Sequence, residues 1–317
     1  MSEVKKIATR DSYGNALAEL GTEHDNVVVL DADLAAATKT GVFKKAHPDR
    51  FIDCGIAESN MIGVAAGLAT TGKVPFASSF AMFAAGRAFE QVRNSVGYPH
   101  LNVKIGATHA GISVGEDGAT HQCNEDIALM RTIPGMVVIN PADDVEARAA
   151  VRAAYEHQGP VYMRFGRLAV PVINDRPDYK FELGKGVVLR EGKDLTIITY
   201  GNTTHLCLNV AELLYKEKGW ELEVIDLRTL IPLDKEAIFN SVKKTSKVLI
   251  VHEDKVFSGF GAEIAGIIGS ELFQYLDAPI QRVGSLFTPV GFHPVLERAI
   301  LPNEETIYHA AKELLLY

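Results

Sequence analysis

The chain has 317 residues, of which 47% are hydrophobic and 23% charged, with a formal net charge of -8 and a pI near 5.7. These values are typical of a soluble globular protein with two domains of ordinary size, and they argue against a nucleic-acid-binding surface. The charged start lacks the apolar core of a signal peptide, and no run of about 18 apolar residues indicates a membrane span. The three cysteines are widely spaced and form no CxxC pair. We therefore expect a cytoplasmic protein with no nucleic-acid or membrane partner.

The first half of the chain alternates short β-branched runs with amphipathic or apolar helical segments. This order predicts a parallel sheet with helices on both faces. The expected strands are 27–31, 51–53, 74–78, 103–107, 136–139 and 161–163, and the expected helices include 60–69, 84–95 and 145–157.

A polar, proline-containing stretch at 171–179 interrupts the alternation, which then resumes. In the second half we expect strands at 195–200, 222–226 and 248–251, with helices at 204–216, 235–241, 261–271 and 305–315. The sequence thus predicts an α/β fold of two parallel-sheet sandwich domains with helices on both faces. We place the first domain at residues 1–175, a linker at 176–182 and the second domain at 183–317.

Carboxylates, aromatic rings, histidines and an arginine follow the expected strands of the first domain. Ligands bind beyond the carboxyl ends of the strands in an open parallel sheet, so these side chains are expected to share one rim. In chain order they are Asp31, Asp33, Glu58, Phe80, Phe83, His109, Asp117, His121 and Arg164.

Two of these features have an ordinary structural interpretation as well. Glu58 opens an almost entirely apolar segment, so it is either a first-turn glutamate that stabilises its helix or a buried carboxylate that needs a partner. Phe80 and Phe83 are three residues apart and can share one face, either as core residues or as the wall of a binding site.

The glycine-rich segment 108–122 is too long for a simple connection and carries His109, Asp117 and His121. A zinc site is one interpretation, but no third ligand of suitable geometry is evident. A polar lining for a hydroxylated, anionic substrate suits these side chains better. Arg164 offers a fork of donors for phosphate or carboxylate, or it is simply a surface residue.

Five motifs in this order resemble the pyrimidine-binding and C-terminal domains of the transketolase family over essentially the whole chain. They are DADL at 31–34, FIDCGIAESNM at 51–61, PFASSFAMF at 75–83, GEDGATHQ at 115–122 and GPVYMR at 159–164. The resemblance implies transfer of a two-carbon ketol unit from a ketose, or ketose phosphate, to an aldose through thiamine diphosphate.

The resemblance also implies a role for each matching residue. As catalytic residues it implies Glu58, which would bond N1′ of the cofactor's aminopyrimidine, and His121. It implies that Asp33, Phe80 and Phe83 contact the cofactor, with both rings packed on the pyrimidine. For the sugar or sugar phosphate it implies Arg10, His109, Asp117, His121 and Arg164.

Two positions depart from the family pattern. Ala37 replaces a serine that helps to hold phosphate, and Gly86 replaces a tyrosine of the pyrimidine pocket. The chain also lacks the Gly-Asp-Gly motif and downstream asparagine through which thiamine enzymes bind diphosphate and Mg²⁺. The nearest string, at 115–118, carries a glutamate at its second position and belongs to the glycine-rich segment 108–122, so we predict no metal ligands in this chain.

The resemblance to split transketolases therefore implies that an N-terminal partner subunit holds the diphosphate and Mg²⁺. We expect an α2β2 heterotetramer in which the second domain contributes mainly to dimer packing. The alternatives are a 1-deoxyxylulose-5-phosphate synthase-like enzyme, the beta subunit of a 2-oxo acid dehydrogenase, and a non-catalytic α/β subunit.

Overall fold

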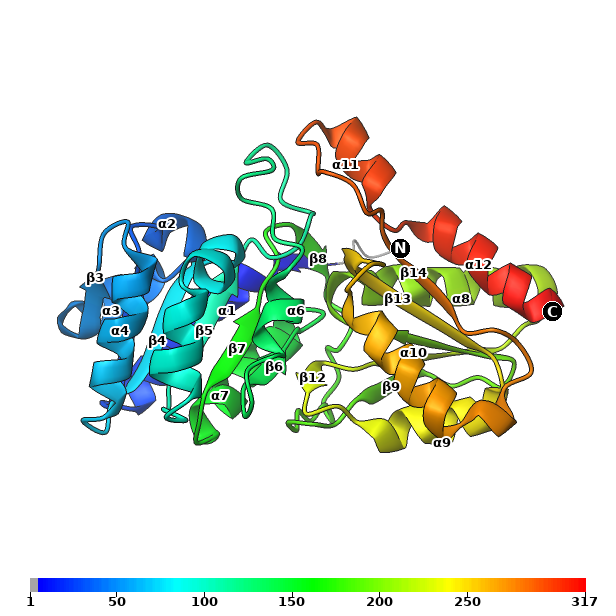
Figure 1. Cartoon of the computed structure of the whole chain (residues 1–317), viewed down its shortest axis with the longest axis horizontal. Coiled ribbons are helices and arrows are strands. Elements are labelled where there is room, and N and C mark those ends of the chain that lie inside the picture. Colours follow the sequence, from blue (N-terminus) through cyan, green and yellow to red (C-terminus); the bar gives the residue numbers. More distant parts are fainter. Residues whose placement is uncertain (1–4) are drawn as a thin grey trace.

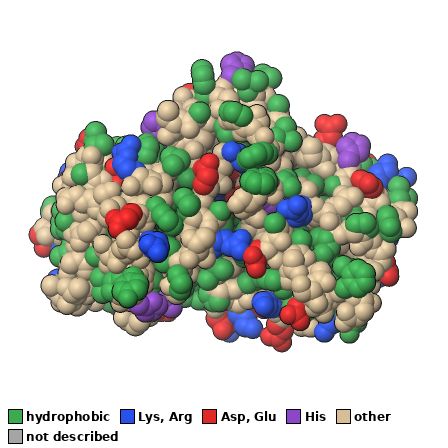
Figure 2. All heavy atoms as spheres, viewed as in Figure 1, with side chains coloured by type: hydrophobic (Ala, Val, Ile, Leu, Met, Phe, Trp, Pro, Cys, Tyr) green, Lys and Arg blue, Asp and Glu red, His purple; other side chains and the backbone are tan. Residues whose placement is uncertain are grey.

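The computed structural model of the chain describes residues 5–317, which form two α/β units packed side by side (Figure 1). A seven-stranded sheet and a five-stranded sheet each carry helices on both faces, as the sequence predicts. Among these described residues, no helix has both the length and the apolarity to cross a membrane. Side chains of both charges are interspersed with hydrophobic ones on the face shown in Figure 2.

The first sheet is parallel except at one edge, where a strand from the second half of the chain pairs antiparallel with it. Its strands in spatial order are β12 (Thr229–Ile231), β6 (Val137–Ile139), β7 (Val161–Arg164), β5 (Lys104–Thr108), β4 (Val74–Phe80), β2 (Val27–Asp31) and β3 (Phe51–Asp53).

The second sheet is also parallel apart from one antiparallel edge strand, β9. Its order is β14 (Gln281–Ser285), β13 (Val248–Lys255), β10 (Leu195–Thr199), β11 (Leu222–Asp226) and β9 (Val187–Arg190). A small antiparallel ribbon joins β1 (Lys6–Ala8) to β8 (Ala169–Pro171).

Helical segments cover both sheets. In the first unit they are α1 (Thr9–Glu23), α2 (Ala35–Thr38), α3 (Gly41–Ala46), η1 (Pro48–Arg50), α4 (Glu58–Ala69), η2 (Met82–Arg87), α5 (Phe89–Gln91), η3 (Val92–Gly97), α6 (Asp126–Met130) and α7 (Asp144–Glu156). In the second unit they are η4 (Gly201–Thr203), α8 (Thr204–Lys218), α9 (Lys235–Thr245), α10 (Phe260–Glu271), η5 (Phe273–Tyr275), α11 (Pro294–Ile300) and α12 (Glu304–Leu316).

Three differences from the predicted elements affect the site. β4 and β7 run further than expected, so Phe80 and Arg164 are the last residues of their strands and do not follow them. The helix expected at 84–95 is divided, because the wider π-helical turns η2 and η3 flank the short α5. Wider turns of this kind often occur at functional sites, where they re-aim side chains.

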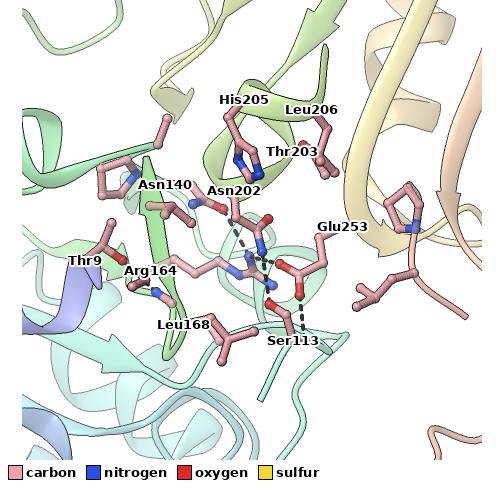
Figure 3. Close-up of a pocket in the computed structure, with 18 residues that line it drawn as sticks. Thr9, Ser113, Asn140, Arg164, Leu168, Asn202, Thr203, His205, Leu206 and Glu253 are labelled. Atoms are coloured by element: carbon pink, nitrogen blue, oxygen red, sulfur yellow. Dashed lines mark hydrogen bonds and ion pairs between the residues drawn. The ribbon is translucent and has the colours of Figure 1, made fainter. Parts of the chain in front are cut away.

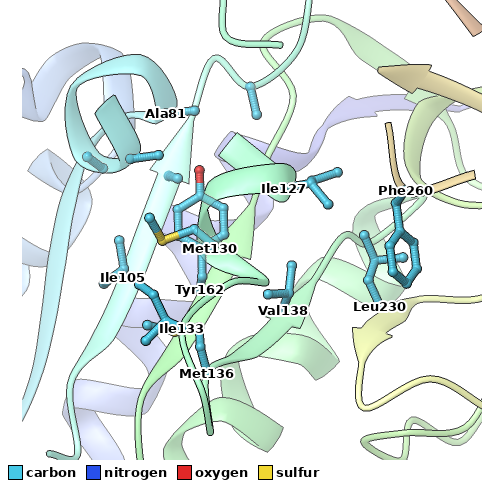
Figure 4. Close-up of a cluster of buried hydrophobic side chains, with 14 of the residues drawn as sticks. Ala81, Ile105, Ile127, Met130, Ile133, Met136, Val138, Tyr162, Leu230 and Phe260 are labelled. Carbon is cyan, nitrogen blue, oxygen red and sulfur yellow. The ribbon is translucent and has the colours of Figure 1, made fainter. Parts of the chain in front are cut away.

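One hydrophobic core continues from the first sheet into the second (Figure 4). Ile127, Met130 and Val138 of the first unit belong to the same buried cluster as Leu230 and Phe260 of the second. Because both units exclude water from this shared core, they are fixed against each other.

Gly106 of β5 lies against Tyr13, which is fully buried and bonds Ser78 Oγ through its hydroxyl at 2.6 Å. A Cβ at Gly106 would collide with that hydroxyl. We expect Gly106→Ala to lower the free energy of unfolding by about 1–3 kcal/mol, because the crowded core cannot absorb the methyl group. Gly266→Ala, in the exposed part of α10 where a Cβ meets open space, is the matched control. Chemical denaturation measures both variants, and we expect Gly266→Ala to be at least as stable as the wild type because alanine favours the helix. A Gly106→Ala variant as stable as the wild type would contradict the expectation.

Candidate active site

Glu58 begins α4 at the carboxyl edge of the first sheet, and its side chain is 1% exposed. Arg87 Nη1 donates hydrogen bonds to both carboxylate oxygens, at 2.9 and 2.8 Å. The Arg87 side chain is 49% exposed. The structure therefore supports the interpretation of Glu58 as a buried carboxylate that needs a partner. That partner is Arg87, whose side chain extends inward from the surface.

Arg87 also connects this carboxylate to the two phenylalanines. Its guanidinium lies over the ring of Phe83, 4.4 Å from the centroid. Phe83 and Phe80 lie nearly parallel, with their centroids 6.0 Å apart. Glu58, Phe80 and Phe83 thus lie near one another, as predicted. Arg87 contacts both Glu58 and Phe83, and Phe83 lies beside Phe80.

His109 follows β5 and stacks on Phe80, with the ring centroids 3.8 Å apart. Arg10 Nη1 lies 3.0 Å from His109 Nε2, and Thr108 Oγ1 lies 3.1 Å from Nδ1. Because arginine can only donate, Nε2 accepts and the ring proton lies on Nδ1. His109 therefore forms part of the wall and orients Arg10.

The electrostatic surroundings keep His109 neutral. Its pKa is lowered to about 3, first by burial and then by the positive charges of Arg10 and Arg167. His121 and Lys39 act in the same direction. The positive charges that converge on His109 are well placed to attract an anionic ligand.

His121 contacts both phenylalanines edge-on, with its centroid 5.7 Å from Phe80 and 5.3 Å from Phe83. Its Nδ1 lies 2.8 Å from Thr120 Oγ1. Within residues 5–317, Nε2 has no recorded hydrogen bond and so can contact a ligand. We call Glu58, Arg87, Phe80, Phe83, His109 and His121 the Glu58 cluster.

Arg10 and Asp117 lie beside this cluster, and Arg167, which the sequence analysis missed, lies between them. Arg167 Nε is 3.6 Å from Asp117 Oδ2. Arg10 Nη1 also donates to the carbonyl of Ala37 at 3.1 Å. The pKa of Arg10 is lowered, first by burial, and the nearby charge of Arg167 contributes. Arg10 and Arg167 thus bring two guanidinium groups to one end of the site.

The prediction that Arg164 lies among the substrate residues needs correction, because its side chain does not lie with Arg10 and His109. It is 4% exposed and points toward the junction of the two units (Figure 3). Its Nε donates to Asp126 Oδ2 at 2.8 Å and its Nη1 to Asn140 Oδ1 at 3.1 Å. As the last residue of β7, Arg164 stays in the sheet, whereas Arg167 lies beyond the strand and reaches the site.

Arg164 also lines a cavity of about 220 Å³ between the two units. Ser113, Asn202, His205 and Glu253 are among the other residues around it (Figure 3). Phe80, Phe83 and Glu58 are absent from this lining. The cavity is therefore separate from the Glu58 cluster.

Asp33 lies on the same edge of the sheet but outside the cluster. It is exposed, with φ 61°, and its amide donates to Asp53 Oδ1 at 3.2 Å. In the part of the chain that the structure describes, no three His, Cys, Asp or Glu side chains group closely enough to hold a metal ion.

Arg87 and Arg167 are the two residues that the sequence analysis missed. Arg87 lies four positions after Phe83, a spacing that places two side chains on one helical face and was a detectable signal. Arg167 carries no comparable pattern. Its place depends on the path of the chain after β7.

Two family models match nearly all of the chain. The transketolase pyrimidine binding domain matches residues 5–172, and the transketolase C-terminal domain matches residues 184–307.

Relatives of similar length are also found. A transketolase C-terminal section of Methanocaldococcus jannaschii is 50% identical over 277 residues, which cover 87% of this chain and 85% of that protein. The 6-deoxy-6-sulfo-D-fructose transketolase subunit SqwH of Clostridium sp. is 40% identical over 307 residues, covering 96% of this chain and 94% of the relative. A solved structure of a split gene transketolase, an inactive β4 tetramer, is 46% identical with a TM-score of 0.87 and covers 98% of this chain and 99% of that one.

These matches agree with the strand order and with the residues gathered around Glu58. The chain therefore belongs to the transketolase family, in which it corresponds to the C-terminal subunit of a split transketolase.

Proposed function

We propose that this chain and an N-terminal partner subunit together form a thiamine-diphosphate-dependent transketolase. The complex would transfer a two-carbon ketol unit from a ketose with an anionic terminus to an aldose. The observation that carries this proposal is the Glu58 cluster, in which Arg87 links a buried carboxylate to one of two parallel phenylalanine rings. We also propose a cytoplasmic α2β2 assembly and the division into residues 1–175, 176–182 and 183–317.

The residues of the cluster fit the pyrimidine end of the cofactor. An aminopyrimidine offers ring nitrogens for hydrogen bonding and two apolar faces for stacking, which a carboxylate and phenylalanine rings match. When bound, thiamine diphosphate supplies the nucleophilic carbon that takes up the ketol unit. Glu58 would hold a proton between its carboxylate and a pyrimidine nitrogen, and Phe80 and Phe83 would keep water from that bond.

The Arg87 contact must open for this bond to form. Because the Arg87 side chain is about half exposed, its guanidinium can swing toward solvent without disturbing the core. Arg87 therefore satisfies the buried Glu58 carboxylate until the cofactor ring takes its place.

The partner subunit would hold the diphosphate and Mg²⁺. Two observations support this division. The sequence has no Gly-Asp-Gly motif, and the similar split gene transketolase is described as inactive when it forms a β4 tetramer.

Exposed phenylalanines of the second domain would form a docking surface for the partner, and one of them, Phe292, lies against Gly118. Phe257, Phe287 and Phe292 are 66%, 69% and 62% exposed, and the Phe257 and Phe287 rings lie 4.6 Å apart. Grouped exposed aromatic side chains are typical of protein interfaces.

The anionic terminus of the substrate would lie toward Arg10 and Arg167. These guanidinium groups, with Lys39, surround the neutral His109. Ala37 provides no hydroxyl here, and its carbonyl instead fixes Arg10. A phosphate and a sulfonate present the same tetrahedral oxyanion, and one relative is named for a sulfo sugar.

The partner requirement predicts that the chain alone binds no thiamine diphosphate. We expect calorimetry to show no heat of binding for the isolated chain with Mg²⁺, and micromolar binding once the partner is added, because the partner supplies the metal ligands. Micromolar, Mg²⁺-dependent binding by the isolated chain would overturn this division.

Glu58→Gln tests the role of the carboxylate. In the reconstituted complex we expect kcat for ketol transfer to fall by about 10²-fold or more, because an amide cannot exchange the proton with the pyrimidine. Sedimentation should show unchanged assembly. Glu156→Gln, at the exposed end of α7, is the matched control and should keep its activity. Normal turnover by Glu58→Gln would remove this residue from the mechanism.

Arg10→Gln tests the anionic subsite. We expect KM for a phosphorylated ketose donor to rise roughly 10–100-fold, since a charge-assisted hydrogen bond contributes about 1.5–3 kcal/mol. KM for erythrulose, which carries no phosphate, should change little. An equal rise for both donors would show that Arg10 supports the fold of the site without contacting an anion.

A further inference from the structure

Two glutamates of the second domain bond to the backbone of the substrate loop. We use this name for residues 111–122, which carry Asp117 and His121. Glu253, in β13, accepts hydrogen bonds through Oε1 from the amides of Ile112 at 2.9 Å and Ser113 at 2.7 Å. Glu297, in α11, accepts through Oε2 from the amide of Gly115 at 2.8 Å. The substrate loop of the first domain is thus anchored by the second.

The loop lies close against these side chains. At Gly111, where φ is +86°, a Cβ would lie 2.5 Å from the Glu253 carboxylate carbon. At Gly118, where φ is +76°, a Cβ would lie 3.2 Å from Phe292. Only glycine combines this backbone conformation with so close an approach. Gly111 and Gly118 therefore match the surface of the second domain.

Arg164 explains how Glu253 can be buried as a carboxylate. Glu253 is 3% exposed, and its Oε2 lies 3.9 Å from Arg164 Nη1 (Figure 3). A buried charge needs such compensation. Because Oε2 faces Arg164, Oε1 is free to accept hydrogen bonds from the amides of Ile112 and Ser113. Arg164 thus pairs with acids at the domain junction and is not one of the residues that we propose for the substrate.

Asn202 adds a third contact from the second domain. Its Nδ2 donates to Ser113 Oγ at 3.0 Å (Figure 3). On the other side, Arg167 Nη1 donates to the carbonyl of Val114 at 2.6 Å. The loop is therefore held between Arg167, at one side of the substrate site, and the acids of the second domain.

We propose that Glu253 and Glu297 are positioning residues, which set the conformation of the substrate loop so that Asp117 and His121 face the Glu58 cluster. This inference rests on the proposed function for its catalytic consequence, but the anchoring itself is independent of it. The second domain then orders the active site directly, in addition to any packing between subunits.

Glu297→Ala is the most direct test, because Glu297 bonds only one loop amide in the described structure. We expect hydrogen exchange at the Gly115 amide to accelerate at least about 10-fold, since the amide loses its acceptor. In the reconstituted complex, KM for the ketose donor should rise about 10-fold with a smaller change in kcat. Glu297→Gln retains an acceptor oxygen and should recover part of both effects.

Glu271→Ala, at the exposed end of α10, is the matched control and should leave loop exchange and KM unchanged. Exchange in β10 and the melting temperature of Glu297→Ala should also match the wild type. Unchanged exchange at Gly115, or a loss of activity that follows global unfolding without a change in KM, would overturn the proposal. If the wild-type complex showed no ketol transfer at all, the proposed function would be wrong. The rate of hydrogen exchange at the Gly115 amide would still show whether Glu297 anchors the loop.

Discussion

The site depends on keeping a carboxylate where almost no water reaches it. Glu58 is 1% exposed, and a charge in that position requires a donor or a cation. Arg87 supplies the cation from the solvent side, and its guanidinium also lies over Phe83. The carboxylate and the aromatic wall are therefore held by one side chain. A binding site built in this way stays folded when empty and can still be opened by a ligand that offers a better partner.

Arg164, a buried cation, plays the corresponding part at the junction of the domains. Arg164 lies among Asp126, Glu253 and Asp254, all within 4 Å of its guanidinium. These groups are fixed because the hydrophobic core runs through both units without interruption. A rigid junction is what allows an acid on one sheet to set the conformation of a loop on the other. The two domains therefore behave as one frame around the site.

Sequence reasoning found the parts of the site that follow from strand geometry. The ends of β2, β4 and β5 were nearly correct, and they bring Phe80 and His109 to one edge. It failed at Arg164 because its β7 strand extends one residue beyond the predicted end. A side chain that is still in the sheet points to one of its faces, and for Arg164 that face carries Asp126 and meets Glu253 of the second unit. Contacts such as Glu253 with Ile112 span 141 residues, and no local pattern predicts them.

The geometry also shows why such an enzyme can be divided between two chains. The groups proposed to bind the substrate are positioned by contacts within this chain, namely Arg10, Arg167 and the anchored loop. Glu58, which we propose for the pyrimidine, is paired with Arg87 within this chain. In the proposed complex the partner would contribute the hard oxygen ligands for a metal and the site for a diphosphate. A division at that point separates two chemical tasks without cutting through a hydrophobic core.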